Sequence, residues 1–421
     1  MWSLFGVVIA LGFVIVLIRM HKNFGLSLLA GAFVLGLFGV FDGNLSLLEV
    51  GKAYVEGTCY SFESGWYAET VLLALLMTLI FMLATCMQRL GAVSRLVESM
   101  RTVFVHGGML GVVPAVYGLM PVPGGAMFSA PLVDEEGKRF GLKQSEKNFL
   151  NVWFRHIWFS IYPISSAMIL ICSASFSDID IALLMAVNVP AFVTALGVGL
   201  VYLRFVLRKH PKPKKSQNRD WSGFVFLLPP LIPIAVYAVL SIWSVSQVPS
   251  FIVGVLCSFV ALFVLLKIPL KQFASALKKS ITWKLVAAIF GIMVFRQMFE
   301  ATGASSLLAE VLTTQSLSPL FIIVGLPILL GILTGYNLGA MTLSYPLVEP
   351  FFASSGLGIV GVSSLVFMSS VAGYLISPIH LCNVVSSEYL KTDTTRMYKN
   401  YIPAVAMMLG VQIVWLLLGG F

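Results

Sequence analysis

The sequence predicts an all-α membrane protein with about ten transmembrane helices and two re-entrant hairpins, built as two repeats of inverted topology. Three observations predict this fold class. First, 58% of the 421 residues are hydrophobic and only 11% are charged, whereas a soluble domain carries about a quarter charged residues. Second, apolar runs close to the ~20 residues that cross a bilayer recur along the whole chain. Third, the second half of the chain repeats landmarks of the first half.

Ten apolar segments have the character of full crossings. They span residues 2–18, 25–41, 67–87, 149–172, 180–203, 223–244, 250–266, 285–300, 364–388 and 400–420. The first segment lacks a basic start and a small-residue cleavage site, so we expect a retained helix and not a signal peptide. Two further stretches, 103–133 and 318–350, are interrupted in the middle by Pro and Gly. We interpret these two as re-entrant hairpins, with arms that reach the bilayer midplane and return.

The distribution of positive charge supports this scheme. If the N-terminus lies outside, the cytoplasmic loops are 19–24, 88–102, 134–148, 204–222, 267–284 and 389–399. Every Lys and Arg except Lys52, Arg155 and Arg296 falls in these loops, as the positive-inside rule requires. We therefore expect a multi-pass protein of the cell inner membrane with both termini outside. The net charge of +9 then reflects topology, and no nucleic-acid partner is expected.

The two halves share a collinear series of short matches. The matched pairs, at offsets of about 213 residues, include Gly91-Ala92 with Gly303-Ala304, Pro114 with Pro327, Gly118 with Gly331, Gly125-Ala126-Met127 with Gly339-Ala340-Met341, and Pro163-Ile164 with Pro378-Ile379. Each half holds five crossings and one hairpin. Because five is odd, the second half enters the membrane from the opposite face, which is typical of secondary transporters.

Four breaks in the apolar segments predict a substrate site. They lie at Pro121–Gly125, Tyr162–Ser166, Thr334–Gly339 and Ser377–His380. Irregular backbone is tolerated in a membrane only where it is buried in protein or lines a cavity, and new half-helices favour anions at their N-termini. The candidate substrate-binding residues are Pro123, Gly124, Gly125, Ser129, Ser165, Ser166, Thr334, Gly335, Asn337, Gly339, Ser377, His380 and Asn383. We expect Asn337→Ala or Ser377→Ala to weaken ligand binding.

Two charged groups near the breaks have alternative interpretations. His380 either contacts an anion or carries a coupled proton, or it is a neutral histidine bonded within the bundle. Arg155 starts the expected fourth crossing, and we interpret it as a side chain that snorkels to the cytoplasmic interface in preference to a functional charge. The middle of every expected crossing lacks Asp and Glu, which disfavours a cation/H⁺ antiporter.

A membrane-embedded enzyme is the third alternative. The sequence contains no zinc motif, and no pair of its five cysteines has metal-ligand spacing. We therefore expect no enzymatic activity, no cofactor and no metal ion apart from Na⁺ as a coupling ion in the hairpin-tip and helix-break regions.

The layout and two strings, MPVPGGAMFSAPLVDE (120–135) and GYLISPIHLCNVVSSEYL (373–390), resemble an uncharacterised prokaryotic integral membrane family of the ion transporter superfamily. Its relatives include divalent-anion/sodium symporters, gluconate permeases and TRAP-transporter membrane subunits. In place of the Ser-Asn-Thr motifs of the sodium/dicarboxylate members, this chain carries Pro-Gly-Gly and Tyr-Asn-Leu-Gly at the hairpin tips.

The resemblance implies an elevator mechanism in a homodimer. The first repeat, 1–207, would contain scaffold helices in 1–66 and a transport part in 67–207. A basic linker, 208–222, would lead to the second repeat, 223–421, with scaffold helices in 223–284 and a transport part in 285–421. We expect a secondary transporter for a small carboxylate-type anion, driven by Na⁺ or H⁺, with a cation/H⁺ antiporter as the alternative.

Overall fold

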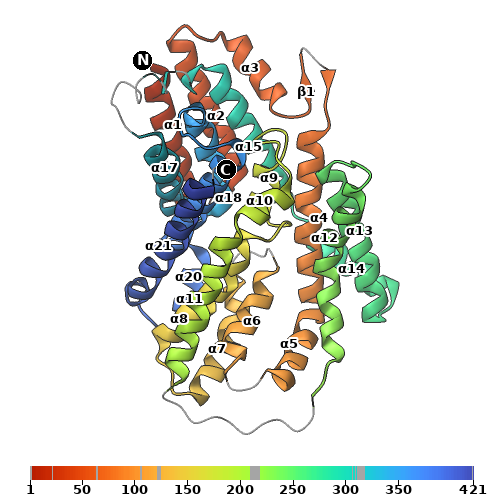
Figure 1. Ribbon diagram of the computed structural model, residues 1–421. Helices are drawn as coiled ribbons and strands as arrows, with labels where there is room; N and C mark the ends of the chain where they lie inside the picture. Colours follow the sequence, from red (N-terminus) through yellow and green to blue (C-terminus); the bar gives the residue numbers. More distant parts are fainter. Residues whose placement is uncertain are drawn as a thin grey trace.

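The computed structural model describes most of the chain as helices packed along one long axis (Figure 1). The described residues are 2–20, 22–62, 65–104, 107–120, 125–208, 219–305, 307–308, 310, 318–419 and 421. The expectation of an all-α protein is confirmed, since the described strands are limited to one short antiparallel pair, β1 (Tyr60–Ser61) and β2 (Gly65–Trp66).

Within the described chain, 8 helical segments are long and apolar enough to cross a membrane. They contain α1 (Trp2–Arg19), α2 (Phe24–Phe41), α4 (Glu69–Arg89), α11 (Val189–Leu207), η2 with α12 (Ser222–Leu227, Leu228–Ser241), α13 (Gln247–Leu266), α15 (Trp283–Ala301) and α21 (Thr394–Gly419). Each overlaps one of the crossings expected from the sequence. The short helix α10 (Ile181–Val187) leads directly into α11.

The two other expected crossings, 149–172 and 364–388, are interrupted helices. The first consists of α8 (Gln144–His156), η1 (Ile157–Ser160) and α9 (Ser166–Ile171), and the second of α19 (Ile359–Leu375) and α20 (Leu381–Tyr389). Pro163 and Pro378 lie in the gaps, where proline removes a backbone donor and clashes with the preceding turn. The expected breaks in these two segments are therefore confirmed.

The two stretches expected to be hairpins each form two packed helices. They are α6 (Met109–Gly118) with α7 (Ala126–Arg139), and α17 (Pro319–Thr334) with α18 (Asn337–Val348), which continues into η3 (Glu349–Phe351). Figure 1 places α6 and α7 in the lower half of the molecule and α17 and α18 in the upper half. Both chain ends lie in the upper half of the same view.

Three helices lie in segments for which the sequence analysis expected no helix. They are α3 (Leu47–Glu56), α5 (Ala92–Val103) and α14 (Leu270–Ser280). The segments 88–102 and 267–284, which the sequence analysis expects as cytoplasmic loops, therefore contain helices. In α5, the buried residues Val93, Leu96, Val97 and Met100 recur at helical spacing, so one apolar face packs against the bundle while Arg and Glu cover the other.

The centre of the molecule is formed by helices that are buried on every side. All residues of α18 and nearly all of α19 are buried, and α8 is buried from Lys147 to His156. Buried amides link α8 to α20, because Asn148 Nδ2 donates to Ser387 Oγ and Asn151 Nδ2 to Ser386 Oγ, each at 2.8 Å. These bonds satisfy polar groups that burial would otherwise destabilise.

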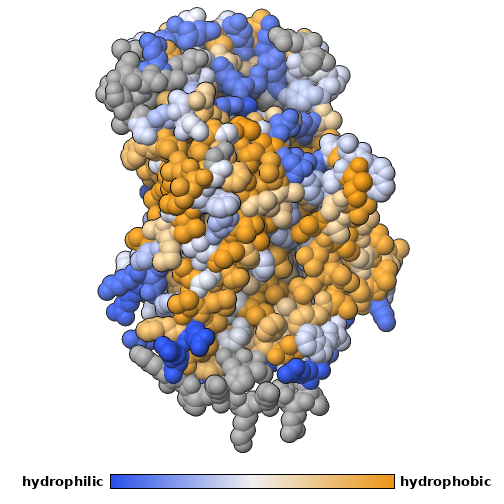
Figure 2. Space-filling model, viewed as in Figure 1, coloured by the Kyte–Doolittle hydropathy of each residue, from blue (hydrophilic) through white to orange (hydrophobic). Residues whose placement is uncertain are grey.

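The outer surface supports a membrane location. Large apolar side chains stay exposed on the peripheral helices, including Val201 of α11 at 70%, Val260 of α13 at 64% and Leu418 of α21 at 82%. Figure 2 shows apolar side chains over the middle of the visible face and hydrophilic ones gathered toward its two ends. Exposed apolar surface of this extent on several helices is typical of a protein surrounded by lipid.

Candidate functional site

A cavity of about 610 Å³ lies where the interrupted helices and the hairpins meet. Its described lining comes from the ends of α1 and α6, from α4 and α15, from the α8–α9 break, from the second hairpin tip and from the α19–α20 break. Its size falls within the range of ligand pockets. Three of the four breaks expected from the sequence therefore meet at one place in the molecule, next to the end of α6, whereas residues 121–124 of the remaining break lie outside the described residues.

Arg155 is the most buried charged residue of this cavity. The last turn of α8 carries it, and only 4% of the residue is exposed. Its Nη1 donates to the carbonyl of Tyr117 at 2.8 Å, and its Nη2 to the carbonyl of Met120 at 3.5 Å. The expectation that Arg155 snorkels is therefore wrong: α8 begins at Gln144, so Arg155 falls at its inner end, beside the first hairpin.

The cavity wall has a positive electrostatic character. Arg155 and the exposed Arg19 line it, whereas its described lining contains no Asp or Glu. Because charges act more strongly in a low-dielectric interior than in water, a buried guanidinium favours an anion in the adjacent space. Calcium and magnesium ions, which need several carboxylate or carbonyl oxygens, fit this lining poorly.

The α8–α9 break contributes two predicted residues, Ser165 and Ser166. Ser165 is buried, and its Oγ has no hydrogen-bond partner among the described residues. A buried hydroxyl without a partner is unfavourable unless a ligand or water satisfies it. Tyr162 also lines the cavity and donates its hydroxyl to the carbonyl of Leu119 at 2.9 Å, which joins the break to the first hairpin.

The second hairpin tip contributes Thr334, Gly335 and Asn337. Gly335 ends α17 at φ +62°, a left-handed conformation that favours glycine. Asn337 starts α18, and its Oδ1 accepts a 2.9 Å bond from Ser370 of α19. The N-terminus of α18 is therefore held beside the cavity, where its free N–H groups favour negative charge.

Five other predicted site residues are absent from the cavity lining, and they contact other parts of the protein instead. Ser129 Oγ donates to Asn151 Oδ1 at 2.6 Å, and Ser377 Oγ donates to the carbonyl of Ile332 at 2.7 Å. Asn383 Nδ2 donates to the carbonyl of Leu375 at 3.1 Å. Gly125 and Gly339 pack against Arg155 and Phe24, respectively. Pro123 and Gly124 lie outside the described residues.

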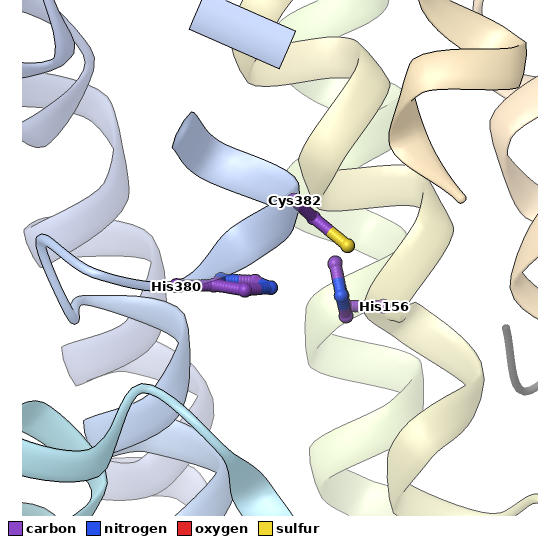
Figure 3. Close-up of side chains that lie close together, drawn as sticks. All are labelled: His156, His380 and Cys382. Atoms are coloured by element: carbon purple, nitrogen blue, oxygen red, sulfur yellow. The ribbon is translucent and has the colours of Figure 1, made fainter. Parts of the chain in front are cut away.

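His380 is fully buried behind the cavity, next to a second histidine. Its ring centroid is 4.8 Å from that of His156, which lines the cavity, and 3.9 Å from that of Tyr374. The ligand atoms of His156, His380 and Cys382 all lie within 4.8 Å of one another. Figure 3 shows the two imidazole rings and the Cys382 sulfur converging on one point.

Sequence reasoning missed several side chains of this site. Tyr162, Tyr336 and Tyr374 line the cavity together with Cys382. Tyr162 and Tyr336 lie within predicted breaks, so their position was a usable signal. The proximity of His156 to Cys382 had no such signal, because these residues lie far apart in the chain.

The interrupted helices, the apolar exterior and the central cavity together define a multi-pass helical membrane protein. The chain belongs to the family described as "Protein of unknown function (DUF401)", whose model matches residues 5–420. None of the curated proteins compared with the chain matches it.

Proposed function

We propose that this protein is a secondary active transporter that moves a small organic anion of the carboxylate type across the cytoplasmic membrane, coupled to Na⁺ or H⁺. One observation carries the proposal. Three of the four expected interruptions and the end of α6 meet around a cavity whose described charged lining consists of Arg19 and Arg155, without a carboxylate. A planar guanidinium binds a carboxylate through two parallel hydrogen bonds, and Ser165, Ser166 and the N-terminus of α18 supply neutral donors nearby.

The arrangement of matching elements supports an inverted repeat. Gly118 of α6 and its repeat partner Gly331 of α17 each pack against the backbone of an interrupted helix. A Cβ atom on Gly118 would lie 2.1 Å from the carbonyl oxygen of Arg155, and one on Gly331 would lie 2.6 Å from the amide nitrogen of Tyr374. Equivalent close contacts in the two halves are expected if both halves share one fold.

An elevator mechanism in a homodimer, as in the ion transporter superfamily, is part of the proposal. The cavity lies between residues of the expected scaffold, Ile18 and Arg19 of α1, and residues of the expected transport part, such as Arg155 and Asn337. In such a mechanism the hairpins and interrupted helices move as one body past a fixed scaffold. Asn151 bonds both the first hairpin and α20, and Asn337 of the second hairpin accepts a bond from α19, which is consistent with one body.

A thermal-shift screen of the purified protein tests the function. Small mono- and dicarboxylates and sugar acids are added with Na⁺, with K⁺, and at two pH values. Binding at 100 times Kd stabilises the native state by about 2.7 kcal/mol, so we expect at least one carboxylate to raise the Tm of the wild type. This shift should disappear in Arg155→Gln and remain in Arg101→Gln, whose arginine pairs with Glu135 on the surface.

Ser165→Ala provides a second test if Arg155→Gln does not fold. Stabilisation by a carboxylate only with Na⁺ would indicate a sodium symporter. If no anion stabilises the protein and Na⁺ or low pH alone does so, the anion-transport proposal is wrong and the cation/H⁺ antiporter replaces it.

A further inference from the structure

We propose that His156, His380 and Cys382 form a binding site for a thiophilic d¹⁰ cation, Zn²⁺ or Cu⁺, with one coordination position open to the cavity. The proposal goes beyond the transport function and does not depend on it. Two imidazole nitrogens and one thiolate are ligands that these ions prefer. The residues come from two interrupted helices, since His156 ends α8 while His380 and Cys382 begin α20.

The three donors are close enough for one ion. They lie within 4.8 Å of one another, whereas donors of a tetrahedral zinc site are about 3.3–3.8 Å apart, given bonds of ~2.0 Å to nitrogen and ~2.3 Å to sulfur. Small rotations of the side chains therefore complete the site without a backbone shift. His156 and Cys382 also line the cavity, so the fourth position of a tetrahedron faces it, as in zinc sites that bind a water or a substrate.

The tautomer of His156 suits a metal ligand. Its Nδ1 lies 2.6 Å from the carbonyl oxygen of Val152, and a carbonyl oxygen can only accept, so Nδ1 carries the proton. Nε2 then keeps its lone pair and points to the cluster, where the hydroxyl of Tyr374 lies 3.3 Å away. Histidines that bind metals typically donate their other ring nitrogen to such a carbonyl, which fixes the ring.

His380 supplies the second, independent observation. The residue is 0% exposed, and both of its ring nitrogens lack a hydrogen-bond partner among the described residues. Buried polar side chains are nearly always satisfied by protein or water, so two unpaired nitrogens in one ring call for a ligand. An ion bound to one of them, opposite His156, provides it.

The charge balance also favours a thiophilic ion. Binding replaces the proton of the Cys382 thiol, so one proton is released for each ion bound, and the thiolate offsets part of the ion's charge. The negative charge of the thiolate favours cation binding here, because Arg155 precedes His156 in the chain and adds positive charge to the same cavity. Hard cations such as Mg²⁺ would lack carboxylate ligands here, since the described cavity lining contains no Asp or Glu.

Cobalt substitution tests the site directly. The full-length protein, carrying no polyhistidine tag, is treated with a chelator and titrated with Co²⁺. We expect one equivalent to produce a thiolate-to-cobalt charge-transfer band and the intense visible bands of a tetrahedral ion. Cys382→Ala should abolish the charge-transfer band and weaken Co²⁺ binding on the order of 100-fold. Cys257→Ala, which removes an exposed cysteine, should leave the spectrum unchanged.

Two further measurements make the outcome decisive. Displacement of Co²⁺ by Zn²⁺, or by Cu⁺ under anaerobic conditions, shows which ion binds more tightly. X-ray absorption of the Zn²⁺-loaded wild type should detect one sulfur and two nitrogen donors, and this test requires no variant to fold. The proposal is overturned if stoichiometric Co²⁺ gives no thiolate band, if Cys382→Ala retains the band, or if no sulfur donor is detected.

Discussion

The Nη2 atom of Arg155 lies 2.1 Å from the position that a Cβ atom on Gly125 would occupy. Gly125 starts the second arm of the first hairpin, and Arg155 ends α8. The absence of a side chain at position 125 thus allows the guanidinium to approach the backbone of the hairpin. The position of Gly125 at a predicted break favours a substrate contact, whereas in the structure it accommodates the arginine.

Gly125→Ala should therefore impair anion binding indirectly. The new methyl group displaces the Arg155 guanidinium, and overpacking of this kind destabilises a protein by about 1–3 kcal/mol. We expect the carboxylate-dependent thermal shift to be lost at a modest cost in Tm. Gly197→Ala is the matched control, because a Cβ atom there meets nothing within 4 Å; in a helix this change should stabilise by about 0.5–1 kcal/mol. Wild-type anion affinity in Gly125→Ala would contradict this prediction.

Gly335→Ala should destabilise the protein more than Gly303→Ala. Both glycines have positive φ, +62° and +67°, so each alanine costs about 1–2 kcal/mol for a left-handed conformation. A Cβ atom on Gly335 would also lie 2.7 Å from Ile379 Cγ1 and 3.0 Å from the carbonyl oxygen of Ile379, whereas one on Gly303 meets nothing within 4 Å. Thermal unfolding of the two variants measures the difference, and equal losses of Tm would show that the tip does not pack against the α19–α20 break.

Two buried serines should respond in opposite ways to alanine. Ser129→Ala removes a hydrogen bond to Asn151, so we expect a loss of about 1–3 kcal/mol in stability with anion affinity unchanged. Ser165→Ala removes a cavity-facing hydroxyl that has no partner among the described residues. We expect its stability to be unchanged and its anion affinity to fall. Ligand titrations followed by Tm separate the two effects. If Ser129→Ala weakened anion binding and Ser165→Ala did not, the binding site would lie nearer the first hairpin.

Asp134→Asn should be strongly destabilising. Asp134 bonds Lys147 at 3.0 Å, and the Lys147 side chain is only 3% exposed. Removing one partner of a buried ion pair leaves an uncompensated charge and costs about 3–5 kcal/mol. Glu135→Gln is the control, because Glu135 pairs with Arg101 on the surface, where an ion pair is worth about 0–1 kcal/mol. Chemical unfolding measures the free energy of unfolding of both variants. Similar losses in Asp134→Asn and Glu135→Gln would mean that Lys147 reaches solvent.

The sequence predicted the helix breaks well, because their cause is local. Pro163 and Pro378 each remove a backbone donor and clash with the preceding turn, which favours a break at these positions, and Gly335 permits the reversal at the second tip. The amphipathic helices α5 and α14 do not stand out as apolar runs, because only one face of each is apolar. Their helical spacing of apolar residues was present in the sequence, as Val93, Leu96 and Met100 show.

The environment of Arg155 and the three-residue cluster depended on tertiary structure. A shift of a few residues in the start of α8 moves Arg155 from a membrane interface to the centre of the protein. His156 meets Cys382 only because α8 and α20 pack together. Neither the hydropathy nor the charge distribution of the sequence predicts such contacts between distant segments.

The amide pairs that join α8 to α20 constrain how the chain is assembled. Helix α8 carries Lys147, Asn148, Asn151 and Arg155, which makes it a poor candidate for insertion into lipid by itself. Its partners Ser386 and Ser387 are translated near the end of the chain. During synthesis, therefore, the amides of Asn148 and Asn151 lack these hydrogen-bond partners until α20 has emerged from the ribosome. The first half of this protein therefore does not reach its final packing as an independently folded unit, because the packing of α8 is completed only after α20 has been made.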